Sequence, residues 1–393
     1  MKKIYNESTI SGTIKFCSDM NLIIGGSVNI CGSDKLDDYY SDDNVLNDPC
    51  GNRFGRALFY AKNCKNIMLC GEEGCIIDGR GALWKENSKD FSSRPCLIRF
   101  IDCENVLIKN VKLVNSPAWG IHLQNCQNVR IENVKIISDC NHNNDGIDID
   151  SCKNVIVENC FIDTGDDATV LKATKNISNE NIIIKNCTLS SRGAGFKIGT
   201  ESVGDFNNIG FINNVIEKSE GGSIKIVPTD GGMVDNVIIQ DITIKKGTGP
   251  IFIANGSRMR TYYEGHKRDD LSKIKRVTIK NVSADVYIRE EESAKAGRGV
   301  VFVTGTPENK IEKLTVENCT FYMPCGVDDT NTKFSVKELS NEYPEYYTLG
   351  TAPAYGAYLR HIKSVDFQNV KFIKKAEDTR EEIVAEDVEE LNK

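Results

Sequence analysis

The chain has 393 residues, of which 40% are hydrophobic and 27% are charged. This composition is ordinary for a soluble globular protein and excludes a disordered chain, a collagen and a coiled coil. The 49 basic and 56 acidic residues give a net charge of −7, which disfavours a nucleic-acid binder because such proteins usually carry a basic patch. The length fits either two compact domains or one elongated solenoid.

The chain begins Met1-Lys2-Lys3 and continues with polar residues, without the apolar core of an export signal. No apolar run approaches the roughly 18 residues of a membrane-spanning helix. Fifteen cysteines form an odd total without any CxxC pair, which favours reduced thiols over disulfides or zinc sites. We therefore expect a cytoplasmic protein with no membrane segment, no metal and no other cofactor, or a secreted protein if a signal was trimmed.

Residues 1–60 are irregular in their spacing and include an acidic loop from Asp34 to Asp48. Such a segment is typical of an N-terminal cap that protects the exposed edge of the first coil of a solenoid.

One phrase recurs between residues 61 and 373: an Asn, then Val or Ile, then alternating variable and apolar residues, and a second Asn. Clear copies begin at Asn66, Asn105, Asn128, Asn154, Asn181, Asn208 and Asn236, and weaker ones at Arg276, Lys313 and Ser364. The central copies lie 23 to 28 residues apart, a period that indicates stacked repeats. Their apolar and polar alternation, with many Val and Ile residues, predicts a strand in each copy.

Short strands that stack in parallel at about 4.8 Å, with Asn and Gly in the turns, predict an all-β chain folded as a right-handed parallel β-helix of roughly ten coils. Asn suits the corners because it tolerates a left-handed backbone and can hydrogen-bond its own backbone. Four cysteines each stand two residues before a repeat Asn, and we expect them to form a buried stack of unpaired thiols. They are Cys64, Cys103, Cys126 and Cys152.

Two neighbouring coils carry an excess of acid, in the segments 143–150 (NNDGIDID) and 164–168 (TGDDA). Asp145 and Asp167 are 22 residues apart, so we expect Asp145, Asp166 and Asp167 on adjacent coils. Like charges this close raise the pKa of at least one carboxyl group, which keeps one group protonated while others are ionised. Glycoside hydrolysis needs that division of roles. The alternative, that Asp and Gly only form turns, suits Asp150 better than these three.

Lys172, Lys197 and Lys225 follow at spacings of 25 and 28 residues, and the apolar neighbours of the last two predict outward-facing ammonium groups. Such a row beside the acids would suit the carboxylate of a uronic acid. The alternative is that the lysines only neutralise Asp148 and Asp150.

Other polar residues near the acids have weaker signals. His122 lies one coil before them, which favours a structural role, and Glu201 is a spare carboxylate. The gaps between repeats widen after Asn236, which indicates loop insertions that wall a cleft. The first such loop has residues that either bind a sugar ring or cap the coil. They are Arg258, Arg260, Tyr262 and Tyr263.

Residues 374–393 are rich in charge and place Val384, Val388 and Leu391 at helical spacing. We expect a short C-terminal capping helix or a tail there.

Taken together, NNDGID and TGDDA resemble the Asn-x-Asp and Asp-Asp motifs of the polygalacturonase family, glycoside hydrolase family 28. The segments 115–122 (NSPAWGIH) and 77–81 (IDGRG) are similar to others of that family, and the resemblance extends over residues 58–372. It implies a β-helical glycosidase that cleaves pectin with inversion. It further implies that Asp166 is the general acid and that Asp145 and Asp167 hold and deprotonate the water. Asn143 would contact the substrate.

Two departures from the family pattern concern its substrate-binding residues. The family's Gly-His-Gly corresponds to Gly193-Ala194-Gly195, without the histidine, and its Arg-Ile-Lys corresponds to Ser223-Ile224-Lys225, without the arginine. The resemblance therefore implies a substrate other than plain polygalacturonate, such as rhamnogalacturonan or a modified uronide, or an exo-acting mode. The predicted substrate-binding residues are Asn143, Lys197 and Lys225.

Two other functions remain open from the sequence. A pectate-type lyase would use the acids to bind calcium and would need a basic proton abstractor. A non-catalytic carbohydrate-binding β-helix would keep its sugar-binding face without Asp166. For each of these functions we expect a pectic oligo- or polysaccharide as the partner, and neither nucleic acid nor a membrane. The sequence does not indicate an oligomeric state.

Overall fold

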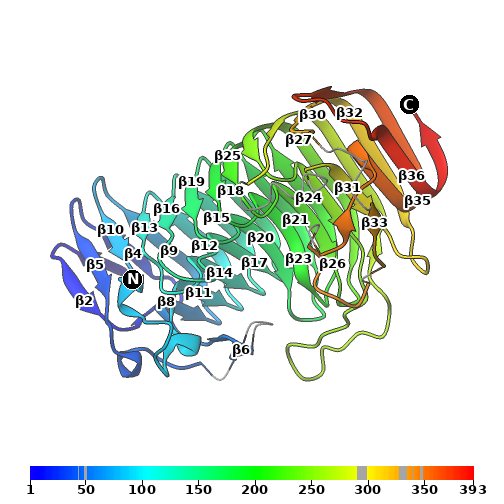
Figure 1. Cartoon of the computed structure of the whole chain (residues 1–393). Helices are drawn as coiled ribbons and strands as arrows, with labels where there is room; N and C mark the ends of the chain where they lie inside the picture. The colour runs from blue at the N-terminus through cyan, green and yellow to red at the C-terminus, as the bar shows by residue number, and fades with distance from the viewer. Residues whose placement is uncertain (43, 48–50, 290–298, 327–333, 339, 346–347) are drawn as a thin grey trace.

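The computed structural model describes residues 1–42, 44–47, 51–289, 299–326, 334–338, 340–345 and 348–393. They form a right-handed parallel β-helix whose coils stack from the N-terminal to the C-terminal end in Figure 1. Strands make up 56% of the residues, and the helical pieces within the described part are short 3-10 turns, so the predicted fold class is confirmed. These turns are η1 (Leu36–Asp38), η2 (Gly81–Leu83) and η3 (Phe91–Ser93).

The strands form three parallel ladders, in which each strand pairs with its equivalents in the coils before and after it. The first ladder contains the Asn phrases and consists of β1 (Lys2–Tyr5), β4 (Asn21–Ile24), β9 (Lys65–Gly71), β12 (Glu104–Lys109), β15 (Gln127–Glu132), β18 (Lys153–Glu158), β21 (Asn179–Lys185), β24 (Phe206–Ile212) and β27 (Met233–Gly247). The second consists of β2 (Thr9–Ser11), β5 (Asn29–Gly32), β10 (Ile76–Asp78), β13 (Lys112–Val114), β16 (Lys135–Ser138), β19 (Phe161–Thr164), β22 (Thr188–Ser191) and β25 (Val215–Ser219), and it also pairs with β27.

The third ladder supports the acidic motifs. It consists of β3 (Ile14–Lys15), β8 (Ala57–Lys62), β11 (Cys96–Ile101), β14 (Ile121–Gln124), β17 (Ile147–Asp150), β20 (Thr169–Ala173), β23 (Phe196–Ser202), β26 (Ile224–Pro228), β28 (Ile251–Ala254) and β31 (Val301–Thr304). The stack continues through β29 (Lys273–Ile274), β30 (Arg276–Val286), β32 (Ile311–Met323), β35 (Ala354–Lys374) and β36 (Glu381–Asn392). Two small antiparallel pairs, β6 (Leu46–Asn47) with β7 (Arg53–Phe54) and β33 (Ser335–Val336) with β34 (Gly350–Thr351), lie in loops.

The repeat asparagines occupy left-handed corners, with φ between 54° and 58° in the seven clear copies. Their side chains bond to each other from coil to coil: Asn154 donates to Asn128 at 3.1 Å, and Asn181 donates to Asn154 at 3.0 Å. The predicted left-handed corners are thus confirmed. The amide of Asn66 donates to Asp19, and in the six later copies the partner is the neighbouring coil's Asn and not the residue's own backbone, because equivalent corners stack one strand spacing apart.

The interior of the coils is apolar and contains the predicted thiol stack. Cys64, Cys103, Cys126 and Cys152 are buried and unpaired, and the Cys126 amide donates to the sulfur of Cys152 at 3.3 Å. The prediction of buried, unpaired thiols is therefore confirmed for these four. They fill small spaces between the larger Ile, Val and Phe side chains of the core.

The two ends of the chain extend the stack. Strands β4 and β5, which lie within the predicted N-terminal cap, pair in parallel with β9 and β10, so the parallel pairing continues across residue 60. At the other end, β36 pairs in parallel with β35, and the predicted helix is wrong. Val384, Val388 and Leu391 have helical spacing, but they belong to a final strand. That strand places them against the preceding coil, where they are partly buried.

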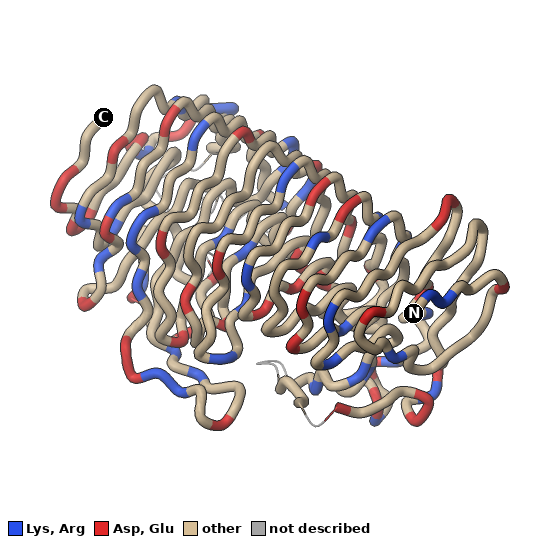
Figure 2. Tube along the Cα trace, turned by 180° about the vertical axis from the view of Figure 1, so that it is seen from behind, with Lys and Arg blue, Asp and Glu red and all other residues tan. Residues whose placement is uncertain are grey.

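The outer surface of the coils is charged and mixed in sign. Figure 2 shows Lys and Arg residues interspersed with Asp and Glu along the solenoid. Among the described residues, no helix has the length and apolar character needed to cross a membrane.

Candidate active site

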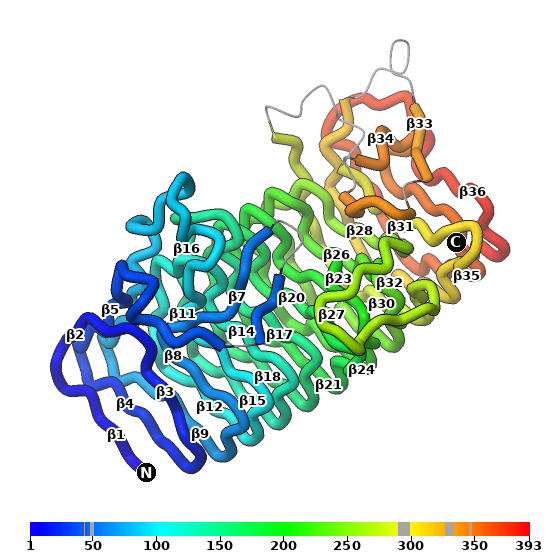
Figure 3. Tube along the Cα trace, turned by 90° about the horizontal axis from the view of Figure 1, so that it is seen from below, coloured from blue at the N-terminus to red at the C-terminus, as the bar shows by residue number. Residues whose placement is uncertain are grey.

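The acidic motifs lie where the chain enters β17 and β20 of the third ladder. Ile147, Ile149 and Leu171 are fully buried in the core, and strand alternation therefore turns Asp148 and Lys172 to the outer face. Loops cover much of this face. Figure 3 shows the segment with β7 crossing over β11 and β14.

Asp145 and Asp167 occupy stacked corners, as their spacing predicted. The amide of Gly146 donates to the carbonyl of Asp167 at 2.9 Å, which fixes the two corners on neighbouring coils. Both acids are 3% exposed, whereas Asp166 is only partly buried. The coils thus bring the three predicted acids together, with Asp166 the most accessible.

Asp166 is held by its own turn. Its carboxylate accepts the Asp167 amide at 2.9 Å, and its carbonyl accepts the hydroxyl of Ser191 at 2.6 Å. Burial, followed by the charge of Asp167, raises the pKa of Asp166 to about 6. A carboxyl group with this pKa retains a proton in weakly acidic solution.

Asp167 has the opposite electrostatic character. Burial alone would raise its pKa, but the charges of Lys197 and Lys225 hold it at about 2. Its oxygens accept the amide of Ala194 at 2.8 Å and the ammonium group of Lys197 at 2.8 Å. Ala194, at the position of the missing histidine, thus contributes through its backbone. Asp167 is ionised over the whole ordinary pH range.

Gly193 packs directly against two of these carboxylates. A Cβ atom at this position would lie 2.7 Å from an oxygen of Asp167 and 2.9 Å from one of Asp166. Only glycine leaves room for both carboxylates at this corner.

Asp145 belongs to a buried cluster around Lys172. The Lys172 ammonium group lies 3.6 Å from Asp145, 3.4 Å from Asp148 and 3.3 Å from Glu201. Burial, and then the charges of Asp148 and Asp166, raise the pKa of Asp145 well above its usual range. Burial raises the pKa of Asp148 to about 8, against the pull of Lys172. The spare carboxylate Glu201 is therefore part of the cluster.

The three lysines do not form the single row that their spacing suggested. Lys197 pairs in register with Lys225, but its partner in β20 is Val170, and Lys172 pairs with Asp150. Lys172 therefore lies two residues beyond the position in β20 that is in register with Lys197 and Lys225. The predicted row is correct for Lys197 and Lys225 and wrong for Lys172.

The predicted substrate contact Asn143 lies at the edge of the site, held by two other side chains. Its amide oxygen accepts from Asn52 at 2.9 Å and lies 3.5 Å from Arg94. Arg94 is fully buried and also donates to the carbonyls of Pro117 and His142 at 2.6 Å. No motif or repeat indicated Arg94, because its contacts join segments far apart in the chain.

His122 is fully buried behind the acids. Its Nε2 lies 3.5 Å from Asp150, and burial lowers its pKa to about 4. Asp150 also accepts the hydroxyl of Thr174 at 2.5 Å, and hydrogen bonds from these partners hold its pKa below the usual range despite burial. These contacts support structural roles for both residues.

The loop after β28 folds back over the third ladder. Arg258 donates to Asp230 at 2.6 Å and to the hydroxyl of Tyr262, while Tyr263 accepts from Gln124 at 3.1 Å. Arg260, by contrast, is exposed. Three of the four residues that the sequence singled out here therefore bind the coil surface.

A second loop carries two residues that sequence reasoning missed. The hydroxyl of Tyr343 accepts from Lys197 at 3.0 Å, and both oxygens of Glu345 accept from Lys225, at 2.8 and 2.7 Å. The widened gap before Ser364 predicted an insertion that walls a cleft, but nothing in its sequence identified these two residues.

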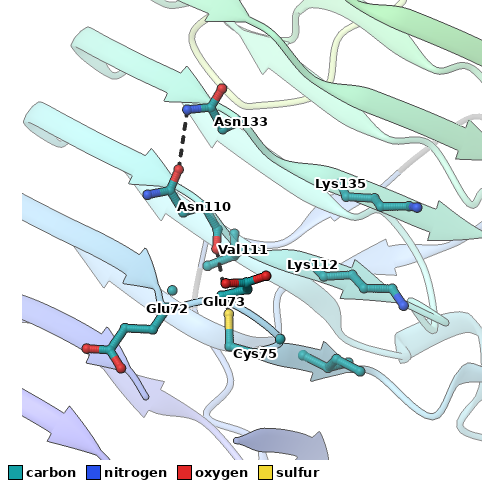
Figure 4. A pocket seen from close by; sticks show the side chains of 11 residues that line it. Glu72, Glu73, Cys75, Asn110, Val111, Lys112, Asn133 and Lys135 are labelled. Carbon is teal, nitrogen blue, oxygen red and sulfur yellow. Dashed lines mark hydrogen bonds between the residues drawn. The ribbon is translucent and has the colours of Figure 1, made fainter. Parts of the chain in front are cut away.

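A surface hollow of about 720 Å³ lies away from these acids (Figure 4). Its walls come from the end of β9, from β10 and from the strands β13 and β16 of the second ladder. They include Glu72, Glu73, Cys75, Asn110, Lys112 and Lys135. The acidic motifs lie on the third ladder, so this hollow is not part of the candidate site.

Comparison with known proteins gives a consistent result. Residues 45–321 match the model of the glycosyl hydrolases family 28. A probable polygalacturonase from Vitis vinifera is 29% identical over 48% of this chain and 41% of its own length, and polygalacturonase QRT2 from Arabidopsis thaliana is 29% identical over 49% and 45%. The chain thus spans less than half the length of these curated relatives. The crystal structure of a hyperthermoactive exopolygalacturonase from Thermotoga maritima superposes with a TM-score of 0.71 at 20% identity, over 95% of this chain and 84% of that one.

Proposed function

The chain belongs to glycosyl hydrolase family 28, and from this premise we propose that it hydrolyses glycosidic bonds of a pectic or uronic-acid-containing oligo- or polysaccharide by an inverting mechanism. The observation that carries the proposal is the set of three adjacent carboxyl groups with separated pKa values. Asp166 has a pKa of about 6, and Asp167 one of about 2. One acid that holds a proton beside one that has lost it is the arrangement that acid and base catalysis requires.

Asp166 acts as the general acid. It is the most accessible of the three, and it donates its proton to the oxygen of the leaving sugar as the glycosidic bond breaks. Asp167 remains ionised and accepts a proton from the water that attacks the anomeric carbon from the opposite side. The raised pKa of Asp145 leaves most of the negative charge on Asp167, so Asp145 contributes mainly by holding that water.

Lys197 acts on the pKa of both the acid and the base. Its contact with Asp167 keeps that carboxylate ionised, and the same positive charge opposes the rise in the pKa of Asp166. Asn143 and Lys225 complete the proposed substrate-binding set, with Asn143 held beside Arg94 and Lys225 one coil beyond Lys197.

The test is a panel of pectic polymers and oligomers of defined composition, with the products separated into saturated and unsaturated sugars. Hydrolysis gives saturated products from at least one substrate. Unsaturated products would instead identify a lyase. Binding without turnover, unchanged in Asp166→Asn, would identify a non-catalytic carbohydrate-binding protein.

We also propose a reducing, cytoplasmic environment. The support is chemical: fourteen cysteines of the described chain are unpaired, and most of them are buried. Detection of the native protein in a cytoplasmic fraction, and not in the culture medium, is the expected result.

A further inference from the structure

Lys225 is already neutralised by a residue of the same chain. Its ammonium group lies 2.8 and 2.7 Å from the two oxygens of Glu345, and the side chains are 3% and 12% exposed. Because so little water reaches this pair, its attraction is screened far less than that of a surface pair. A substrate carboxylate that approached Lys225 would have to displace Glu345 or lie beside a second negative charge.

The neighbouring lysines are occupied in the same way. Lys197 contacts Asp167 at 2.8 Å, and Lys172 lies 3.3 Å from Glu201. Arg258, the next cation along this face, contacts Asp230 at 2.6 Å. Each of these cations therefore already has a carboxylate partner on the protein.

Tyr343 adds an apolar surface at the same place. Its hydroxyl accepts from Lys197, yet the residue is 40% exposed, so the protein leaves part of it open to solvent. An aromatic ring with one polar end offers a sugar an uncharged contact surface.

We propose that Glu345 determines specificity by filling the anion site at Lys225, so that the sugar unit bound there carries no free carboxylate. The unit is a neutral sugar or an esterified uronate within a pectic chain. This inference rests on the proposed function for the substrate class, and it concerns only the position next to Lys225. Glu345 acts as a built-in substitute for a substrate carboxylate and repels a real one.

The test measures binding by calorimetry in an Asp166→Asn background, which holds substrate without cleaving it. The ligands are a galacturonate trisaccharide and its fully methyl-esterified form, in which each carboxylate is replaced by an uncharged methyl ester. The background protein is expected to bind the ester more tightly. Adding Glu345→Gln should tighten binding of the acidic trisaccharide by about tenfold and leave the ester nearly unchanged, because the carboxylate then reaches Lys225 without repulsion.

Two further variants make the result specific. Glu342→Gln removes the same charge from an exposed position of the same loop and should change neither affinity. Adding Lys225→Met to the Glu345→Gln protein should abolish the gain, since the new anion site is then lost.

An acidic trisaccharide that binds the background protein more tightly than the ester, or a Glu345→Gln protein that gains no affinity for it, overturns the inference. Failure to bind either ligand in every variant overturns it as well. The proposed function fails on a separate result, the absence of saturated products from wild-type protein across the pectic panel.

Discussion

At the scale of single residues, two adjacent aspartates in the turn before β20 have pKa values shifted in opposite directions. Asp166 and Asp167 are neighbours in sequence, but only Asp167 receives a lysine at 2.8 Å and a backbone amide at 2.8 Å from the next coil. Asp166 receives one amide from its own turn and remains closer to solvent. The following coil, more than the turn itself, therefore decides which acid holds the proton.

The first prediction concerns the pH dependence of kcat/KM. Asp166 must be protonated, so activity is lost as pH rises through about 6, and Asp167 must be ionised, so activity is lost only as pH falls toward about 2. Lys197→Met should move the upper limb to higher pH, because the lysine charge lowers the pKa of Asp166. The matched variant Lys153→Met, on an exposed strand face, should leave the limb in place. An upper limb that does not move in Lys197→Met would contradict the assignment of Asp166.

The second prediction concerns Gly193. An alanine there forces both carboxylates to move, because its Cβ would lie within 3 Å of their oxygens. Displacing reacting groups by about 1 Å commonly costs on the order of 100-fold in rate, and kcat of Gly193→Ala should fall by about that factor. Gly210→Ala is the control, since its Cβ would meet only apolar side-chain atoms, of Ile212 at 3.2 Å and of Ile183 at 3.8 Å. Equal kcat in Gly193→Ala and wild type would show that the corner tolerates movement.

At the scale of elements, the corners of the first ladder combine backbone strain with a compensating hydrogen bond. Each repeat Asn holds a left-handed backbone that costs most other residues about 1–2 kcal/mol, and each also donates to its counterpart one coil earlier. The repeat that is visible in the sequence is therefore a structural repeat, selected by geometry at the corners.

The third prediction tests this ladder at Asn154. Asn154→Ala removes one bond that the residue donates and one that it accepts, and it adds the backbone cost, so the free energy of unfolding should fall by about 2–4 kcal/mol. Asn154→Gly loses only the hydrogen bonds and should cost less. Urea unfolding followed by circular dichroism measures both. If Gly proves as costly as Ala, the backbone argument is wrong.

The elements also show what the sequence could predict about the site. The 22-residue spacing correctly placed Asp145 and Asp167 on neighbouring coils, since each corner repeats once a coil. The spacing from Lys172 to Lys197 is 25 residues, but Val170 is the residue in register with Lys197. Coil lengths vary by a few residues here, so a spacing close to the period does not fix the register.

The contacts made by loops were outside the reach of such reasoning. Glu345 and Arg94 reach the site from segments with no repeat, and their partners are 120 and up to 49 residues away in sequence. Only the length of the insertion before Ser364 indicated that a loop would border the site. Which residues of that loop contact the site depends on tertiary packing.

At the scale of the whole molecule, one continuous core fills the solenoid from the first coils to the last. Its apolar strands and corner asparagines recur with the period of the coil, which is why the fold class was predictable from the sequence. The final strand β36 was not, because an amphipathic strand at the end of a stack and a short amphipathic helix place their few apolar residues similarly.

The fourth prediction follows from the thiols of this core. Titration of the denatured, unreduced protein should find close to fifteen free thiols per chain, because the described cysteines are unpaired and the stacked ones are sealed inside the coils. In the native protein, a large reagent should reach the exposed Cys17 first, while Cys126 and Cys152 should resist. A count near zero after denaturation would refute both the stack and the reducing environment.

The central claim is inverting hydrolysis by Asp145, Asp166 and Asp167, and it is tested most directly by following the anomeric configuration of the products with NMR from the first turnovers. The account predicts a saturated product of inverted configuration, because the ionised carboxylate activates a water that attacks from the side opposite the leaving oxygen, with no glycosyl-enzyme intermediate. It also predicts that Asp166→Asn loses most of the turnover but binds substrate almost normally, because the amide keeps the shape of the acid and has no proton to donate. A product of retained configuration, an unsaturated product, or full activity in Asp166→Asn would contradict it.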